Sequence, residues 1–406
     1  MTKHQKSYSV AALVGLTPFL AVWMVGCANQ SSGQAASALS ETSAGQVQEL
    51  PAGSFAVQWP VRLPLQGRQI THLYLTDSQV LVYTSGARCY WIDRASGHVN
   101  VVAQAAQRPN DKLFEPAQLP DRVVIPATHE LSVFTPAGKL MHRVPLMYSA
   151  SSGAVGENQR VFLGMDHPNG GRLAAVNTEE QPYAISPAWE LMTFGQLSAT
   201  PAFYDRLIFC GSRDGRVYAV RGEDRAPLWP GLENGVFETG GEILAGLKAD
   251  RDGVYVASMD TKLYCLRVDT GRVQWVYHAG SALKETSTPV LLGDLVLLHV
   301  PGDGVVAIER NAKQDIRKAK WKVDGATQFL AADEDYVYVR GADDRIVAAD
   351  RQTGQVKFTS QRSYSQFATN AGGKDSTIYA ASADGTVYAI RAVVKAGRFG
   401  ELALAR

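Results

Sequence analysis

Few side chains in this sequence combine the type and spacing that a catalytic or metal site needs. The histidines beyond the N-terminal segment are His72, His98, His129, His142, His167, His278 and His299. None of them lies two or four residues from another, whereas a zinc site usually takes such pairs or a convergent cluster. Asp214, Asp303 and Asp384 each precede a turn-type glycine, so we expect them to shape hairpins rather than an acidic site. The sequence therefore predicts no catalytic residue, no cofactor-binding residue or cofactor, and no metal ligand.

The cysteines add little further chemistry. Past residue 27 only Cys89, Cys210 and Cys265 remain, each within an apolar β-type run. An odd number of widely separated cysteines does not predict a disulfide framework, and a buried thiol behaves as a small hydrophobic group. A bridge between Cys210 and Cys265 is the alternative, because neighbouring repeats carry the two residues.

Cys27 is the one residue whose surroundings indicate a covalent modification. An apolar run of about 16 residues, Val10–Val25, follows the basic residues Lys3 and Lys6 and is shorter than a membrane span of about 20. It ends in Met24-Val25-Gly26-Cys27, which resembles the bacterial lipobox, whose cysteine is lipidated and becomes the mature N-terminus. Residues 1–26 are thus expected to be a lipoprotein signal peptide, with an ordinary cleaved signal peptide or an uncleaved anchor as alternatives.

The residues after Cys27 predict a tether and a destination. Residues 27–53 are rich in Ser, Gln, Ala and Gly and hold too little apolar surface to fold, so we expect a disordered linker. Ala28 rather than an aspartate follows Cys27. By the common Gram-negative sorting rule, this resemblance implies an anchor in the outer membrane, facing the periplasm, with the inner membrane left open.

A repeated strand dominates the remaining sequence. Its second residues lie 41 to 46 residues apart, at Cys89, Leu131, Leu173, Val217, Leu263, Val305, Ile346 and Val387. A period in the low forties is typical of a propeller with one four-stranded blade per repeat. Residues 54–395 are therefore expected to form an all-β, eight-bladed β-propeller of antiparallel blades, followed by a C-terminal tail, 396–406.

Turn signals and aromatic residues complete each repeat. Asp-Gly pairs before the recurring strand favour type I′ hairpins, and Thr-Gly or Ser-Gly pairs follow it, as at Gly97. An aromatic residue in the predicted fourth strand, such as Trp229, is large enough to wedge between blades. The last repeat lacks a fourth strand, whereas Phe55–Leu63 matches one, so we expect this N-terminal strand to complete blade eight and remove the open sheet edges.

The repeat resembles the PQQ-like propeller repeat, with Ser-x-Thr-Pro at Ser198–Pro201 and a similar sequence at 287–289. With its lipobox, tether and length, the chain is most similar to the BamB family, lipoproteins of the outer-membrane β-barrel assembly machinery. The resemblance implies a non-catalytic scaffold, monomeric within a hetero-complex, that docks on the barrel-assembly protein. The family stretch that contacts that protein corresponds to Gln196–Pro201, which keeps the family's proline but not its Arg and Glu.

Other functions remain as alternatives. The balance of 40 Lys and Arg against 39 Asp and Glu argues against a nucleic-acid partner. A quinoprotein dehydrogenase is one alternative, because these enzymes have similar repeats. Their large inserted loops and adjacent pair of cysteines have no counterpart in this sequence. Another envelope protein or a cell-wall glycan is a further candidate ligand, with Tyr148, Tyr183 and Phe237 as possible contacts. The loop Asp166–Gly171 and the basic tract Arg310–Lys322 are candidate contact sites, or simply solvated loops.

Overall fold

The computed structural model describes residues 49–50, 52–180, 187–371, 375–394 and 397–398. The description below concerns the unit Gln48–Arg406. The expected signal peptide, the lipidation site Cys27, nearly all of the tether, Tyr183 and most of the C-terminal tail lie outside the described residues. Within the described part of the chain, no helix has the length and apolar character needed to cross a membrane.

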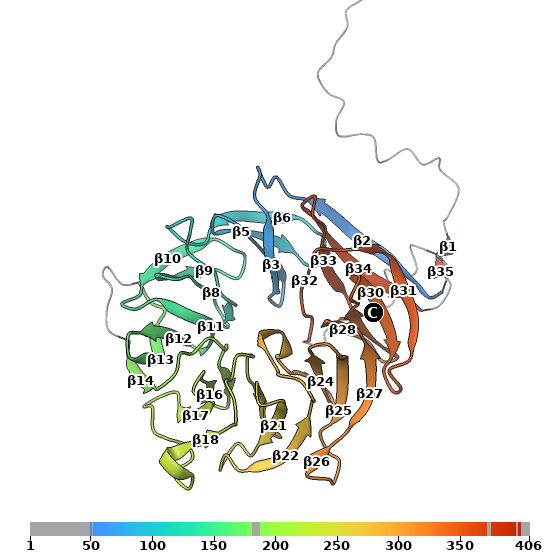
Figure 1. Ribbon diagram of the computed structural model, residues 1–406. Coiled ribbons are helices and arrows are strands. Elements are labelled where there is room, and N and C mark those ends of the chain that lie inside the picture. Colours follow the sequence, from blue (N-terminus) through green and yellow to red (C-terminus); the bar gives the residue numbers. More distant parts are fainter. Residues whose placement is uncertain (1–48, 51, 181–186, 372–374, 395–396, 399–406) are drawn as a thin grey trace, which may run out of the picture. The chain divides into compact units, whose positions relative to one another are not determined.

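Eight antiparallel sheets of four strands follow one another around a ring (Figure 1), which confirms the predicted propeller. Blade 1 contains, from the innermost strand outward, β3 (Ile70–Leu75), β4 (Gln79–Thr84), β5 (Arg88–Asp93) and β6 (Val99–Gln104). Blade 2 contains β7 (Ala117–Gln118), β8 (Val123–Pro126), β9 (Glu130–Phe134) and β10 (Leu140–Pro145). Blade 3 contains β11 (Ala150–Glu157), β12 (Arg160–His167), β13 (Gly170–Asn177) and β14 (Trp189–Thr193). Blade 4 contains β15 (Ala202–Tyr204), β16 (Leu207–Gly211), β17 (Arg216–Arg221) and β18 (Val236–Glu238).

The second half of the ring repeats this order. Blade 5 contains β19 (Lys248–Asp250), β20 (Gly253–Ser258), β21 (Lys262–Leu266) and β22 (Val273–His278), with β26 (Ile316–Arg317) added as a fifth strand. Blade 6 contains β23 (Val290–Leu292), β24 (Leu295–Val300), β25 (Gly304–Glu309) and β27 (Ala319–Asp324). Blade 7 contains β28 (Gln328–Ala332), β29 (Tyr336–Arg340), β30 (Arg345–Asp350) and β31 (Val356–Ser363). Blade 8 contains β32 (Gln366–Phe367), β33 (Ile378–Ala381), β34 (Thr386–Val393) and β2 (Ser54–Arg62). Beside the blades lie the strand pair β1 (Glu49–Leu50) and β35 (Gly397–Arg398) and the short 3-10 helices η1 (Glu233–Gly235) and η2 (Glu285–Ser287).

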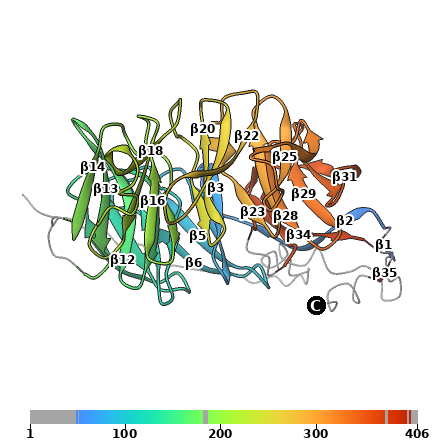
Figure 2. The ribbon, with the colours of Figure 1, turned by 90° about the horizontal axis from the view of Figure 1, so that it is seen from below.

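The core lies between the blades. Figure 2 shows the blades side-on, packed face against face around the ring. The middle strands are therefore covered on both sides, and every residue of β4 and of β20 is buried. This explains why the recurring strands appear in the sequence as continuous apolar runs rather than as an alternating pattern.

The N-terminal strand closes the ring, as the sequence predicts. Strand β2 is the outermost strand of blade 8 and pairs antiparallel with β34, from Ser54 opposite Val393 to Arg62 opposite Thr386. The first and last described strands of the propeller thus share one sheet, so that opening the ring would require all of these backbone hydrogen bonds to break.

The Asp-Gly hairpins differ from the expected type. In the turn from Ser212 to Gly215, Gly215 N donates to Ser212 O and only the final residue has positive φ, at 83°. Asp214 instead accepts a hydrogen bond from Arg216 N at 3.0 Å. A type I′ turn would need positive φ at both central residues. The aspartate therefore stabilises the turn with its side chain, and the glycine supplies the left-handed residue that follows.

Tryptophan side chains join neighbouring blades. The indole Nε1 of Trp229 in blade 4 donates to Val268 O in blade 5 at 2.9 Å. Three other seams contain the same bond: Trp59 to Arg94 O, Trp189 to Gly222 O and Trp321 to Arg351 O, at 2.9 to 3.0 Å. Gly271 has φ of 67°, and a Cβ there would lie 2.4 Å from Trp229 Cδ2. Glycine thus permits both the left-handed turn and the close approach of the ring.

Two seams use other side chains for the same purpose. Between blades 2 and 3, His142 Nε2 lies 2.7 Å from Thr178 O. Between blades 5 and 6, Arg317 Nη2 donates to Arg310 O at 3.1 Å, and its guanidinium lies 5.3 Å from the ring centre of Trp275. The turn carbonyl of the next blade thus accepts a hydrogen bond from tryptophan at four seams and from histidine or arginine at two others. The aromatic residue predicted from the repeat is one of three side-chain types that donate there.

The three described cysteines are all free and buried. Burial raises the pKa of the Cys89 and Cys210 thiols well above the ordinary value and that of Cys265 to about 12. Cys210 and Cys265 therefore form no bridge here, and the interpretation of these residues as small apolar groups holds.

The seam bond makes a testable contribution to stability. We expect Trp229→Phe to keep most of the ring's packing but to leave Val268 O without its donor, which costs about 1–3 kcal/mol. Trp229→Ala removes the ring as well and should cost about 3–5 kcal/mol. Urea unfolding followed by far-ultraviolet circular dichroism measures both changes. A Trp229→Phe midpoint equal to that of the unsubstituted protein would show that the indole N–H does not stabilise the seam.

Candidate functional site

The innermost strands enclose a central cavity of about 960 Å³. Its lining comes from blades 1, 2, 5, 6, 7 and 8 and includes His72, Glu115, Lys248, His299 and Arg340. Burial, with a smaller contribution from the Lys112 ammonium, lowers the pKa of His72, and burial lowers the pKa of His299. Both imidazoles are therefore neutral at pH 7, and the cavity offers hydrogen-bonding groups of balanced charge.

Hydrogen bonds link blades 2, 4 and 5 at one side of the cavity. Thr200 Oγ1 donates to Glu115 Oε2 at 2.9 Å, and Leu247 N donates to Thr200 O at 3.1 Å. Gly153 of blade 3 makes the first contact possible, because a Cβ there would lie 2.6 Å from Thr200 Oγ1 and 2.7 Å from Glu115 Cβ. The bond from Thr200 gives one oxygen of the Glu115 carboxylate a structural role.

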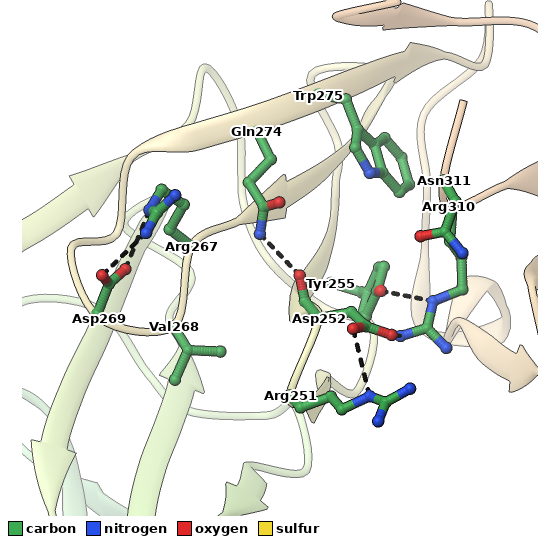
Figure 3. Close-up of a pocket in the computed structure, with 10 residues that line it drawn as sticks. All are labelled: Arg251, Asp252, Tyr255, Arg267, Val268, Asp269, Gln274, Trp275, Arg310 and Asn311. Atoms are coloured by element: carbon green, nitrogen blue, oxygen red, sulfur yellow. Dashed lines mark hydrogen bonds and ion pairs between the residues drawn. The ribbon is translucent and has the colours of Figure 1, made fainter. Parts of the chain in front are cut away.

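A second cavity, of about 480 Å³, lies at the seam between blades 5 and 6 (Figure 3). Arg310 spans it: Nε donates to the Tyr255 hydroxyl at 2.8 Å, and Nη2 contacts both Asp250 and Asp252. On the opposite side, Arg267 forms an ion pair with Asp269 at 3.0 Å. Both guanidinium groups have carboxylate partners: Arg310 pairs across the seam with Asp250 and Asp252, whereas the Arg267–Asp269 pair lies within one turn of blade 5.

A protruding aromatic residue marks the rim of blades 3 and 4. The Phe194 side chain, just after β14, is 80% exposed, the highest exposure among the large apolar residues described. The Arg216 guanidinium lies 5.0 Å from its ring centre. Met192 beside it and the Arg213–Glu242 ion pair are also exposed. An exposed aromatic ring bordered by arginine and methionine has the composition of a protein-binding hot spot.

The loop that carries Phe194 is hydrogen-bonded to its neighbours at several points. Thr193 Oγ1 donates to Gly195 O at 2.7 Å, and Arg213 N donates to Gln196 O at 3.0 Å. Ser151 Oγ donates to Leu197 O at 2.7 Å, and the Leu197 side chain is fully buried. The ring is therefore presented on a rigid support, which lowers the entropy lost on binding.

The surface residues singled out from the sequence fall elsewhere. Tyr148 packs against His167, at 5.7 Å between ring centres, and under the Arg172 guanidinium. Phe237 packs edge-on against Tyr264. These residues do not form a common exposed face. The supposed loop Asp166–Gly171 is mostly strand, because β12 and β13 pair as far as His167 opposite Gly170.

Most of the basic tract is exposed, and four of its basic side chains make contacts within the fold. Arg310 and Arg317 belong to the blade 5–6 seam, Lys320 pairs with Glu309 at 2.9 Å, and Lys322 pairs with Asp303 at 2.6 Å. Sequence reasoning did not single out Phe194. The sequence did contain one indication: Phe194 precedes a glycine in the connection between two repeats. An aromatic ring outside the predicted strands has no neighbouring strand to bury it.

Apart from His72 and His299, which both line the central cavity, the described histidines lie at separate places in the fold. His129 Nδ1 lies 2.8 Å from Asp111 Oδ1, whereas His142 serves a blade seam. The described residues contain no group of three or more His, Cys, Asp or Glu side chains placed to hold a metal ion.

Comparison with solved structures shows the fold. BamB from Moraxella catarrhalis matches with a TM-score of 0.62 at 18% identity, over 83% of this chain and 97% of that one. The C-terminal WD40 domain of Sif2 matches with a TM-score of 0.62 at 12% identity, over 84% and 98%. The computationally designed protein Ika8 matches with a TM-score of 0.60 at 16% identity, over 81% and 98%. At these identities the likeness concerns the propeller alone.

Comparison of the sequence is more specific. No curated protein matches it. A family model described as outer membrane protein assembly factor BamB matches residues 129–360 and 302–394. Because these matches together span more than half of the chain, the protein belongs to the family of outer membrane protein assembly factor BamB.

Proposed function

We propose that this protein is a non-catalytic, lipid-anchored scaffold for the assembly of outer-membrane β-barrel proteins. In this proposal Cys27 carries the lipid and holds the propeller at the outer membrane, on its periplasmic side. The propeller binds other envelope proteins through loops on one rim and contributes no bond-making chemistry or cofactor. Membership of the BamB family supports the assembly role.

The observation that carries the proposal is the rigid, exposed Phe194 on the rim of blades 3 and 4. The neighbouring residues Gln196–Pro201 correspond to the family stretch for which contact with the barrel-assembly protein is expected. Gln196 and Ser198 of this stretch are exposed. The lost Arg and Glu of the family pattern are thus offset by an aromatic anchor beside the same stretch. We propose that the partner's main contact is with this ring.

The central cavity favours one alternative. Its neutral histidines, its threonine hydroxyl groups and the aromatic ring of Phe329 suit an uncharged polar ligand, for example a segment of cell-wall glycan. In that case binding would depend on cavity residues and be insensitive to substitutions on the rim. This gives a direct way to separate the two functions.

Substitution of the anchor tests the proposal. We expect Phe194→Ala to weaken binding to the purified barrel-assembly protein by about 30-fold or more, as for a hot-spot aromatic worth at least about 2 kcal/mol. Titration calorimetry measures the change. Ile316→Ala is the matched control, because Ile316 is 65% exposed but lies on blade 5. Equal affinities for the Phe194→Ala, Ile316→Ala and unsubstituted proteins would rule out this surface as the contact.

Substitution of the expected lipidation site tests the anchor. We expect Cys27→Ser to move the protein from the membrane fraction to the soluble periplasmic fraction and to remove the acyl mass seen by mass spectrometry. Lipid attachment provides the membrane affinity, since each buried methylene contributes about 0.8 kcal/mol. Unchanged membrane association of Cys27→Ser, with no acyl mass on the unsubstituted protein, would contradict lipidation.

A further inference from the structure

The outermost strands of the blades differ in how their free edges are protected. A free edge presents unpaired backbone groups, and charged residues or proline on the edge discourage another chain from pairing there. Most outer strands of this propeller carry such residues: Pro60 and Arg62 in β2, Arg143 and Pro145 in β10, Glu190 in β14, Glu238 in β18, Lys320, Lys322 and Asp324 in β27, and Lys357 and Arg362 in β31.

Two outer strands, β6 and β22, contain no Asp, Glu, Lys, Arg or Pro. The chain covers β22 with its own segment: β26 pairs with it in parallel, Val276 opposite Ile316 and Tyr277 opposite Arg317. Val276 N also donates to Asp315 O at 2.8 Å. An outer edge without charged residues or proline therefore accepts an added strand in this propeller. The added strand, β26, comes from blade 6, and it leaves β6 as the other edge of this kind.

Strand β6 is the other position and has no such cover among the described residues. It lies at the end of its sheet and pairs only with β5, from Arg88 opposite Gln104 to Ile92 opposite Val99. Figure 1 places it on the outer rim of the ring. Val102 is 46% exposed, and Asn100 is exposed as well. Gln104 O accepts a hydrogen bond from Arg143 of blade 2 at 2.8 Å, so the open edge is Val99–Ala103.

We propose that the edge of β6 binds an extended, uncharged segment of a client protein by adding it as a fifth strand to blade 1. The backbone groups of Val99–Ala103 supply the hydrogen bonds, and the exposed part of Val102 supplies an apolar contact. Strands of membrane β-barrel proteins fit this edge before they fold, since they are extended, alternate apolar with polar residues, and carry few charges on the lipid-facing side. The choice of client rests on the proposed function, whereas the binding edge does not.

A synthetic peptide tests the edge directly. The probe is a fluorescein-labelled peptide of alternating Val and Thr, and binding to the purified full-length protein is followed by fluorescence anisotropy. We expect Val102→Lys to weaken binding about tenfold, because the lysine places a charge where the apolar strand must lie. Val356→Lys is the matched control: Val356 is 50% exposed on the outer strand β31, which already carries charges. It should leave the affinity unchanged.

N-methylation of the peptide backbone distinguishes strand addition from nonspecific apolar binding. In a paired strand only alternate N–H groups point toward the neighbouring edge. A peptide N-methylated at alternate positions keeps one unblocked edge and is therefore expected to bind, whereas a peptide N-methylated at every position is expected not to bind. No binding of the unmodified peptide, equal loss in Val102→Lys and Val356→Lys, or equal binding of both methylated peptides would each overturn the proposal.

The result is independent of the test on Phe194. The assay contains no barrel-assembly protein, so failure of the rim contact leaves the peptide measurement unaffected. If Val102→Lys loses secondary structure by circular dichroism, Asn100→Lys replaces it, because Asn100 is also exposed on the same strand.

Discussion

The hydrogen bond from a seam side chain to the turn carbonyl of the next blade is the interaction on which the propeller depends. Each blade packs its faces against two neighbours mainly by apolar contact, which is non-directional. The bond from Trp59, Trp189, Trp229 or Trp321 adds a directional constraint at the outer part of the seam. At two further seams His142 or Arg317 donates to the equivalent carbonyl, so six of the eight seams contain a bond of this kind among the described residues.

Ring closure turns these local constraints into a rigid support. Arg94 shows how the last seam is held: its carbonyl accepts from Trp59, while its guanidinium donates to Tyr379 and Thr76 O and pairs with Asp375. Blade 8 is thereby joined to blade 1 by side chains, in addition to the pairing of the N-terminal strand β2 with β34. In a closed ring, connections such as the one that carries Phe194 can bind a partner without first becoming ordered. The outer strands likewise have a fixed geometry against which another strand can pair.

The sequence was sufficient to predict the fold because the information is repeated. The eight recurring strands, the turn glycines after several of them and the N-terminal strand that replaces a missing fourth strand all follow from the spacing and type of the residues. The turn geometry did not follow, because Asp-Gly suits more than one hairpin and the choice depends on how the aspartate side chain bonds locally. The binding surface did not follow either. Tyr148 and Phe237 look like surface aromatics in the sequence, but both are half-buried, Tyr148 against Arg172 of the same blade and Phe237 against Tyr264 of the next blade.

The most direct test of the central claim is the folding rate of newly made outer-membrane β-barrel proteins in host cells that lack this protein. Pulse labelling followed by the shift in electrophoretic mobility that accompanies barrel folding measures this rate. The account predicts slower folding in the deletion strain and a normal rate once the full-length chain is restored. Folding at the normal rate in the deletion strain, with no change in the amounts of barrel proteins, would contradict a role in their assembly.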